Sequence, residues 1–282
     1  MNIRITILCD NTVNGPLTVI GEHGYAAFIE TERGNYLFDT GQGLTILQNA
    51  HCLKKDLSSI KGLFLSHGHY DHTGGLSNVL TLHNSVKVYA HPDIFSQKYS
   101  LVEIDGNDTQ RYIGIKFPRE HYEKRGAQIV FNSSLSEVAE DIYLTGEIPR
   151  TTEFEEGDPG LIVKNNGSEV SDPLLDDQSL IIRTKHDGLI ILLGCSHSGL
   201  INTIQYVLDQ FKGEKLSAII GGTHLAFLKD DQVEKTITQL KNYNFNKIGV
   251  SHCTGLKAEM RLFQEFKDKF FVANVGTSLV TD

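Results

Sequence analysis

Short apolar runs separated by polar turns dominate the second half of the chain. Three such runs are found at Leu189–Leu193, Leu216–Ile220 and Lys247–Val250. Between and after them, apolar residues recur at the three- and four-residue spacing of a helix, within 201–211, 233–240 and 256–266. Strand and helix therefore alternate. This alternation predicts an α/β fold in which helices cover a sheet of buried strands.

The first 75 residues contain further strand patterns. Met1–Leu8 alternates apolar and polar residues as a first strand does, and Leu63–Leu65 is a short apolar run typical of a buried strand. The region 76–167 has weaker periodicity, with short strands expected near 85–92, 128–131 and 141–145. We therefore expect three parts: a first half of the core (1–75), an inserted α+β segment covering the site (76–167), and a second half of the core (168–282). A simple surface elaboration is the alternative for the middle part.

The stretch directly after Leu63–Leu65 is rich in metal-binding side chains. Three imidazoles and a carboxylate lie within six residues: His67, His69, Asp71 and His72. In an extended loop, alternate side chains share a side, so two neighbouring metal ions could divide this set. Nitrogen and carboxylate ligands suit zinc, and also iron or manganese. The sequence therefore predicts a site for two divalent metal ions, with zinc preferred.

Each apolar run of the second half also ends near a histidine. These are His197, His224 and His252. Because ligands of open α/β sheets bind at the carboxyl ends of strands, we expect these histidines and His67 to share one edge of a sheet. Any one of them alone could be a turn histidine. Four in the same context indicate a single site.

Composition narrows the class of protein. The 282 residues carry 26 basic and 35 acidic side chains, a formal net charge of -9. Nucleic-acid binding is not expected, because the phosphate backbone favours clustered basic residues. No apolar run approaches the roughly 20 residues of a membrane-spanning helix, and the first residues do not resemble a signal peptide. We expect a cytoplasmic protein with no membrane partner. The four cysteines, at 9, 52, 195 and 253, lack the spacing of a disulfide framework.

These motifs resemble those of the metallo-β-lactamase superfamily. Its shared signature is His-x-His-x-Asp-His at the end of a core strand, which matches His67–His72 here. The stretches 194–199, 221–225 and 251–255 resemble, more narrowly, the subgroup that contains the dihydropterin-ribofuranosylaminobenzene-phosphate synthases. The resemblance implies an αββα sandwich. Many members of that subgroup have no assigned substrate, so it implies fold and metal chemistry more firmly than reaction.

The resemblance also implies an assignment of ligands, with one departure. The context of the superfamily's third histidine, Leu174–Leu180, contains no histidine, and Cys195 stands where a bridging aspartate is usual. His197 could replace the missing histidine. We expect His67, His69 and His197 around one metal, and Asp71, His72 and His252 around the other. Cys195 is either a ligand of the second metal or a buried thiol.

Carboxylates near the motif have an expected supporting role. Ligating histidines usually donate their free ring nitrogen to a carboxylate or carbonyl. Asp39 and Asp177 are the candidates for these acceptors.

A two-metal site predicts hydrolysis. A divalent metal lowers the pKa of bound water from about 15.7 to about 7, and Asp71 would orient that nucleophile. The expected substrate is a small molecule bearing phosphate or carboxylate. The candidates to contact it are Arg150, which is favoured because arginine pairs bidentately with such anions, together with His224 and His91. Basic residues are also concentrated between Arg111 and Arg125.

Two other functions stay open. The narrower resemblance implies a transferase in which an aromatic carbon nucleophile displaces diphosphate from an activated pterin. The third hypothesis is a metal-binding sensor or a redox protein. Flavin-linked di-iron members of the superfamily normally carry glutamate where His69 stands, which argues against the redox reading.

Overall fold

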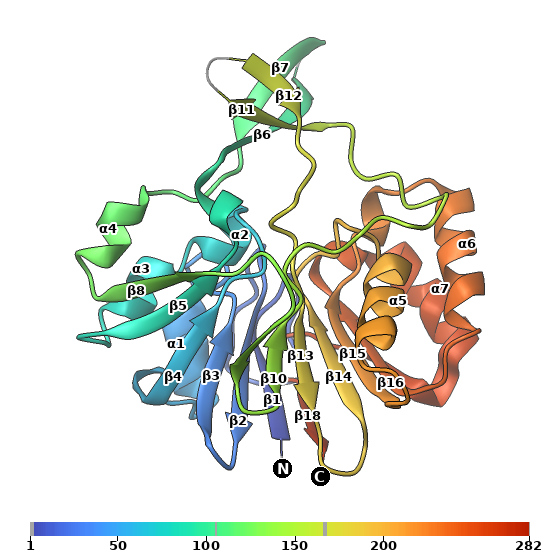
Figure 1. Cartoon of the computed structure of the whole chain (residues 1–282), viewed down its shortest axis with the longest axis horizontal. Coiled ribbons are helices and arrows are strands. Elements are labelled where there is room, and N and C mark those ends of the chain that lie inside the picture. Colours follow the sequence, from blue (N-terminus) through green and yellow to red (C-terminus); the bar gives the residue numbers. More distant parts are fainter. Residues whose placement is uncertain (1–2, 105, 166–167, 282) are drawn as a thin grey trace.

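The computed structural model describes residues 3–104, 106–165 and 168–281. Two seven-stranded sheets lie face to face, and helices cover their outer faces (Figure 1). The first sheet has the order β18-β1-β2-β3-β4-β5-β8. Its strands are β1 (Ile3–Cys9), β2 (Ala26–Thr31), β3 (Gly34–Phe38), β4 (Ile60–Phe64), β5 (Val86–Ala90), β8 (Ala127–Phe131) and β18 (Ser278–Thr281).

The second sheet is built mainly from the second half of the chain. Its order is β17-β16-β15-β14-β13-β10-β9. The strands are β9 (Ser136–Ala139), β10 (Ile142–Leu144), β13 (Leu180–Arg183), β14 (Leu189–Leu193), β15 (Leu216–Gly222), β16 (Phe245–Ser251) and β17 (Phe270–Val272). Strands β14 to β17 run parallel, and β13 pairs with β14 antiparallel. The three apolar runs of the sequence are thus three adjacent parallel strands.

Seven α-helices and five short 3₁₀ helices complete the described part. The α-helices are α1 (Ile46–Cys52), α2 (Tyr70–Thr73), α3 (Leu76–Leu80), α4 (Arg119–Glu123), α5 (Leu200–Gln210), α6 (Asp230–Leu240) and α7 (Leu256–Phe266). The 3₁₀ helices are η1 (Leu57–Ser59), η2 (Pro92–Phe95), η3 (Leu225–Phe227), η4 (His252–Thr254) and η5 (Lys267–Lys269). Helices α5, α6 and α7 lie against the second sheet, as the helical spacing predicted (Figure 1).

Strand β14 shows how the layers are stabilised. All five of its residues are buried, and alternate side chains point to opposite faces of the sheet. Ile191 and its neighbours on one face pack with α5 to α7, whereas Ile190 and Leu192 face the first sheet. A strand buried on both faces reads as a continuous apolar run, which is why the pattern was visible in the sequence. The αββα arrangement predicted from the sequence is confirmed.

The middle of the chain divides differently from the expected segment 76–167. Strands β5 and β8 extend the first core sheet, and β9 and β10 extend the second. A separate four-stranded sheet, of order β12-β11-β6-β7, stands outside both. We call it the cap sheet; it consists of β6 (Gln97–Ile104), β7 (Asn107–Tyr112), β11 (Leu161–Asn165) and β12 (Ser168–Ser171). Short strands of the core sheets and of the cap sheet show the same alternation of apolar and polar residues. The sequence pattern therefore did not indicate to which sheet each strand belongs.

The cap sheet lies over one end of the sandwich, and both termini lie at the opposite end (Figure 1). Beneath it, the carboxyl ends of β4 in the first sheet and β14 to β16 in the second meet. The four histidine-bearing strand ends therefore come from two sheets, not from one sheet edge as expected. Within the described residues, no helix is both long and apolar enough to cross a membrane.

Candidate metal centre

The His-x-His-x-Asp-His motif forms a tight loop followed by one helical turn. Strand β4 ends at Phe64, and α2 begins at Tyr70, so Asp71 and His72 lie in a helix and the motif is extended only through His69. Gly68 lets the loop pass close to its neighbours, because a Cβ there would lie 2.5 Å from the Ile94 carbonyl oxygen. The loop thus turns four polar side chains into the space between the sheets.

One group of imidazoles comes from both halves of the chain. Ligand atoms of His67, His69 and His197 all lie within 4.8 Å of one another, and His67 Nε2 is 2.9 Å from His69 Nδ1. His69 Nε2 and both ring nitrogens of His197 are buried without a hydrogen-bond partner among the described residues. Buried polar atoms normally have a partner, so these nitrogens fit a site that takes a further ligand.

The ionisation of this group also suits metal binding. Burial lowers the pKa of His67 and His197 well below the usual range, and it lowers the pKa of His69 to about 3. The three rings are therefore neutral near pH 7. A neutral imidazole has the free lone pair that coordinates a divalent ion.

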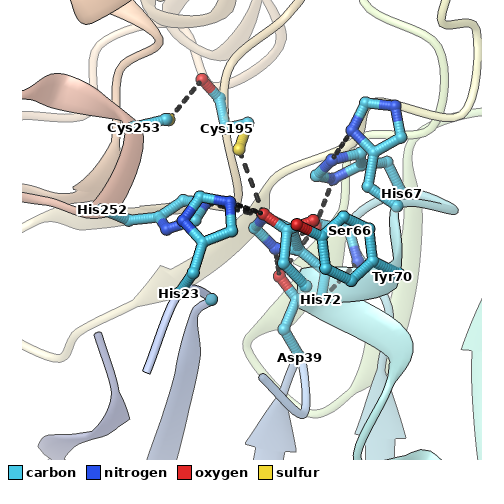
Figure 2. A network of polar contacts seen from close by, with 12 residues as sticks. His23, Asp39, Ser66, His67, Tyr70, His72, Cys195, His252 and Cys253 are labelled. Carbon is cyan, nitrogen blue, oxygen red and sulfur yellow. Dashed lines mark hydrogen bonds and ion pairs between the residues drawn. The ribbon is translucent and has the colours of Figure 1, made fainter. Parts of the chain in front are cut away.

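A second group lies beside the first (Figure 2). His72 Nε2 is 3.1 Å from Cys195 Sγ and 3.2 Å from His252 Nε2. Asp71 Oδ2 is 3.3 Å from His252 Nε2 and 4.0 Å from His72 Nε2. Two nitrogens bound tetrahedrally to one zinc ion at about 2.1 Å would lie about 3.4 Å apart. The candidate donors predicted from the sequence therefore lie close enough together in both groups to hold metal ions.

Asp39 fixes the orientation of His72. It follows β3 and accepts a 2.7 Å hydrogen bond from His72 Nδ1, so that Nε2 of the ring points to the second group (Figure 2). Asp39 also accepts hydrogen bonds from the backbone and hydroxyl of Ser66. Although burial lowers the pKa of His72, the charge of Asp39 raises it to about 9.

Two carboxylates hold the loop that carries His197 by accepting hydrogen bonds from backbone N–H groups. Asp177 accepts a hydrogen bond from the Ser198 N–H at 2.8 Å. Glu155 accepts the Ile201 N–H at the start of α5. Asp177 was expected to support a ligating ring; it instead fixes the loop between β14 and α5.

Several site residues occupy the left-handed backbone region at strand ends. Asp39 has φ +58°, Ser196 +59°, His224 +55° and His252 +55°. Non-glycine residues held in such conformations cost about 1–3 kcal/mol each and persist where the surroundings fix them. Asp10 supplies one such constraint, because its carboxylate accepts the His252 N–H at 2.7 Å.

His23 was not anticipated from the sequence. Its Nε2 lies 3.1 Å from Asp71 Oδ2, and its ring centroid is 5.1 Å from that of His252. Burial raises the pKa of Asp71, but the hydrogen bonds from His23 and His252 outweigh this and hold it well below the usual range. His23 lies in a loop without a motif, about 50 residues before Asp71, so only the fold reveals the pairing.

A pocket of about 370 Å³ opens above both groups. Of the two candidate ligand groups, His69, Asp71, Cys195, His197 and His252 line it, and its walls include cap-sheet residues. Lining residues outside the two groups are His23, Tyr70, Ser100, Val102, Arg111, Ile113, Asp158, Leu161, His224, Phe227 and Cys253. Arg111 Nη2 donates to the Tyr70 hydroxyl at 3.0 Å, with the guanidinium over the Tyr70 ring. A pocket of this size suits a small molecule.

Of the three expected substrate contacts, only His224 lines this pocket. Its Nε2 is 3.3 Å from Asp158 Oδ2. His91 is buried, and its Nε2 lies 3.3 Å from Glu147. Arg150 lines a separate, larger cavity of about 690 Å³ and donates to the carbonyls of His197 and Pro173. Arg150 therefore supports the His197 loop from behind.

Comparisons with known proteins agree with this fold. Over 277 residues, the chain is 35% identical to an uncharacterized protein of Methanocaldococcus jannaschii, covering 96% of this chain and 98% of that protein. It is 33% identical over 285 residues to the 7,8-dihydropterin-6-methyl-4-(β-D-ribofuranosyl)-aminobenzene-5'-phosphate synthase of the same organism, covering 98% and 95%.

A solved structure is similar over nearly the whole chain. It is that of a metal-dependent hydrolase of the β-lactamase superfamily, with a TM-score of 0.81, 29% identity and 98% of each chain covered. The family model described as the metallo-beta-lactamase superfamily matches residues 19–188. The chain belongs to the metallo-β-lactamase superfamily.

Proposed function

We propose that the protein is a dinuclear-metal-dependent hydrolase that acts on a small anionic molecule bearing phosphate or carboxylate. The observation that carries this proposal is the pair of adjacent ligand groups, with unpartnered imidazole nitrogens, at the floor of a small pocket. When bound, two divalent ions supply an acidified water as nucleophile and positive charge for the developing oxyanion.

The side chains at the pocket floor divide the remaining tasks. Asp71 is an acceptor for the proton of the attacking water, and its carboxylate is held in place by His23 and His252. The nitrogens of the first group stay neutral and fixed, because burial and the surrounding loops hold them. Cap-sheet residues form part of the pocket wall.

Arg111 is the proposed anchor for the anion. It lies in the basic stretch that begins at residue 111, and it lines the pocket, unlike Arg150. Its contact with the Tyr70 hydroxyl orients the guanidinium while other N–H groups stay available. Arginine recognises phosphate and carboxylate through a planar pair of donors.

Metal analysis followed by a substrate panel tests the proposal. We expect two zinc ions per chain and hydrolysis of phosphate esters, lactones or thioesters that carry an anionic group. Asp71→Ala should lower kcat about 10²- to 10⁴-fold, whereas Asp231→Ala, an exposed aspartate on α6, should not. A chain that takes up no metal under any reconstitution condition would refute the proposal.

Measurements of KM test the proposed role of Arg111 as the anion anchor. Arg111→Ala should raise KM for the anionic substrate about tenfold to a hundredfold and leave KM for a neutral ester unchanged. Arg125→Ala, which removes an exposed arginine of the same stretch, is the matched control. Equal losses toward both substrates would instead point to a folding role for Arg111.

A pterin transferase is the second candidate. It is supported by the synthase relative at 33% identity and by the aromatic rings of Tyr70 and Phe227 on the pocket wall. In that reaction the carbon–oxygen bond to diphosphate breaks, the aminobenzene partner bonds to that carbon of the pterin substrate and loses a proton, and diphosphate leaves. Diphosphate release that requires the aromatic partner would favour the transferase; release of a hydrolysed product without it would favour the hydrolase.

A further inference from the structure

A second buried thiol lies next to Cys195. Cys253 is in η4, directly after His252, and both cysteines are at most 5% exposed. Ligand atoms of Cys195, His252 and Cys253 all lie within 4.8 Å of one another. Both sulfur-bearing side chains line the pocket, and Figure 2 shows them on the same side of His252.

The backbone around Cys253 leaves room for its sulfur and supplies a donor to it. A Cβ at residue 222 would lie 2.6 Å from Cys253 Sγ, so Gly222 on β15 opens the space that the thiol occupies. The backbone N–H of His224 donates to Cys253 Sγ at 3.2 Å, and the thiol donates to the Cys195 carbonyl at 3.6 Å. A sulfur that accepts an N–H bond can keep that contact as a thiolate.

An independent feature points to a ligand in the same place. His197, 6% exposed, has both ring nitrogens unpartnered among the described residues, and it shares a candidate ligand group with Cys195 and His224. Donor atoms of His72, His197 and Cys253 therefore lie around the Cys195 sulfur. The floor of the pocket is richer in sulfur and nitrogen than a site with an aspartate in place of Cys195 would be.

We propose, on the basis of the two-metal function above, that Cys253 joins Cys195 as a sulfur ligand beside His252, so that the second position selects zinc or ferrous iron over magnesium and manganese. Thiolates favour the softer of these ions, while carboxylate and water ligands suit magnesium and manganese. The two metal positions then differ: nitrogen donors form the first, and sulfur donors contribute to the second.

X-ray absorption of the zinc-loaded full chain tests this without any substitution. Zinc–sulfur distances, about 2.3 Å, are resolved from zinc–nitrogen distances of about 2.0–2.1 Å. With two ions bound, two sulfur ligands give an average of about one sulfur per zinc, and Cys195 alone gives about half of that. A value of one half or less overturns the proposal.

Cobalt binding to substituted chains gives a second readout. Cys253→Ser and Cys195→Ser should each remove about half of the thiolate-to-cobalt absorption, and Cys52→Ser, a half-buried cysteine on α1, should remove none. Unchanged absorption in Cys253→Ser contradicts the proposal. Failure of the unmodified chain to bind two ions would refute the proposed function itself, whereas two ions with only one sulfur ligand would refute this inference alone.

Discussion

At the scale of single residues, the site depends on groups that orient the histidines as much as on the histidines themselves. Asp39 shows this, because its carboxylate bonds His72 and the Ser66 backbone at once while its own backbone is left-handed. Carboxylate partners of ligating histidines raise the basicity of the ring and fix the nitrogen that faces the metal.

Asp39→Asn should weaken zinc binding about 10- to 100-fold, because the amide keeps the shape and tolerates the left-handed backbone but loses the charge that His72 donates to. Competition with a chromophoric chelator measures the affinity. Asp141→Asn makes the same change at a left-handed surface aspartate that pairs with Arg33, and it should leave zinc affinity unchanged. Equal affinity in all three proteins would show that Asp39 is not a partner of a ligating ring.

The sequence predicted which candidate donors would lie together, but it did not predict the direction of every side chain. The histidines of the motif and of the later strand ends were found because ligand residues recur at a recognisable spacing after apolar runs. Arg150 and Asp177 were predicted from the chemistry of their side chains, and the structure turns both toward backbone groups near His197. His23 and Asp158 lie in loops whose path depends on long-range packing, so no local pattern marked them.

At the scale of elements, a buried lysine connects the cap sheet to the loop that carries His67 and His69. Lys98 on β6 is 1% exposed and contacts Asp172 at 2.8 Å and Asp176 at 2.9 Å. The other oxygen of Asp176 accepts the Gly68 N–H, between His67 and His69. The position of the cap sheet is thereby linked to the first ligand group.

Lys98→Met should lower the free energy of unfolding by about 3–5 kcal/mol, because it leaves two buried carboxylates without their cation. Lys164→Met is the control, since Lys164 on the neighbouring strand β11 forms a partly exposed pair with Glu169 and should contribute less than about 1 kcal/mol. Denaturant unfolding measures both. Similar losses for the two variants would contradict a special role for Lys98.

The same ion pairs predict how this contribution varies with pH. Burial lowers the pKa of Lys98, but Asp176 and Asp172 outweigh it and raise the pKa above its ordinary value. A cation whose pKa is raised by folding stabilises the protein fully below its unfolded pKa, about 10.4, and this stabilisation is lost progressively as the pH rises from there through the folded value. The difference between the parent and Lys98→Met should therefore stay constant from neutral pH to about 10.

Element types were easier to predict than sheet membership. The helices α5 to α7 and strands β14 to β16 lie where apolar spacing placed them, because each buries a whole face. The middle segment was taken as one insertion, yet its strands divide among three sheets. Pairing between strands far apart in sequence is decided by the assembled core, which short alternating runs do not encode individually.

At the scale of the whole molecule, the candidate ligand groups draw on both halves of the sandwich. The first sheet provides His67, His69, Asp71 and His72, and the second provides Cys195, His197 and His252. Each ligand group contains members from both halves. Ions that bind these groups only in the folded chain must stabilise the packing of one sheet on the other.

Metal removal should therefore lower the melting temperature. Zinc at about one hundred times its dissociation constant adds about 2.7 kcal/mol to the free energy of unfolding, and a chelator should remove that increment. His197→Ala should lose part of the zinc-dependent shift, because it deletes the only donor of the first group that comes from the second sheet, whereas His186→Ala, on an exposed turn, should keep the whole shift. Calorimetry with and without zinc measures each protein. If zinc binds stoichiometrically but both variants show the same shift as the parent, His197 does not join the two halves through a metal, and the assignment of the first group fails.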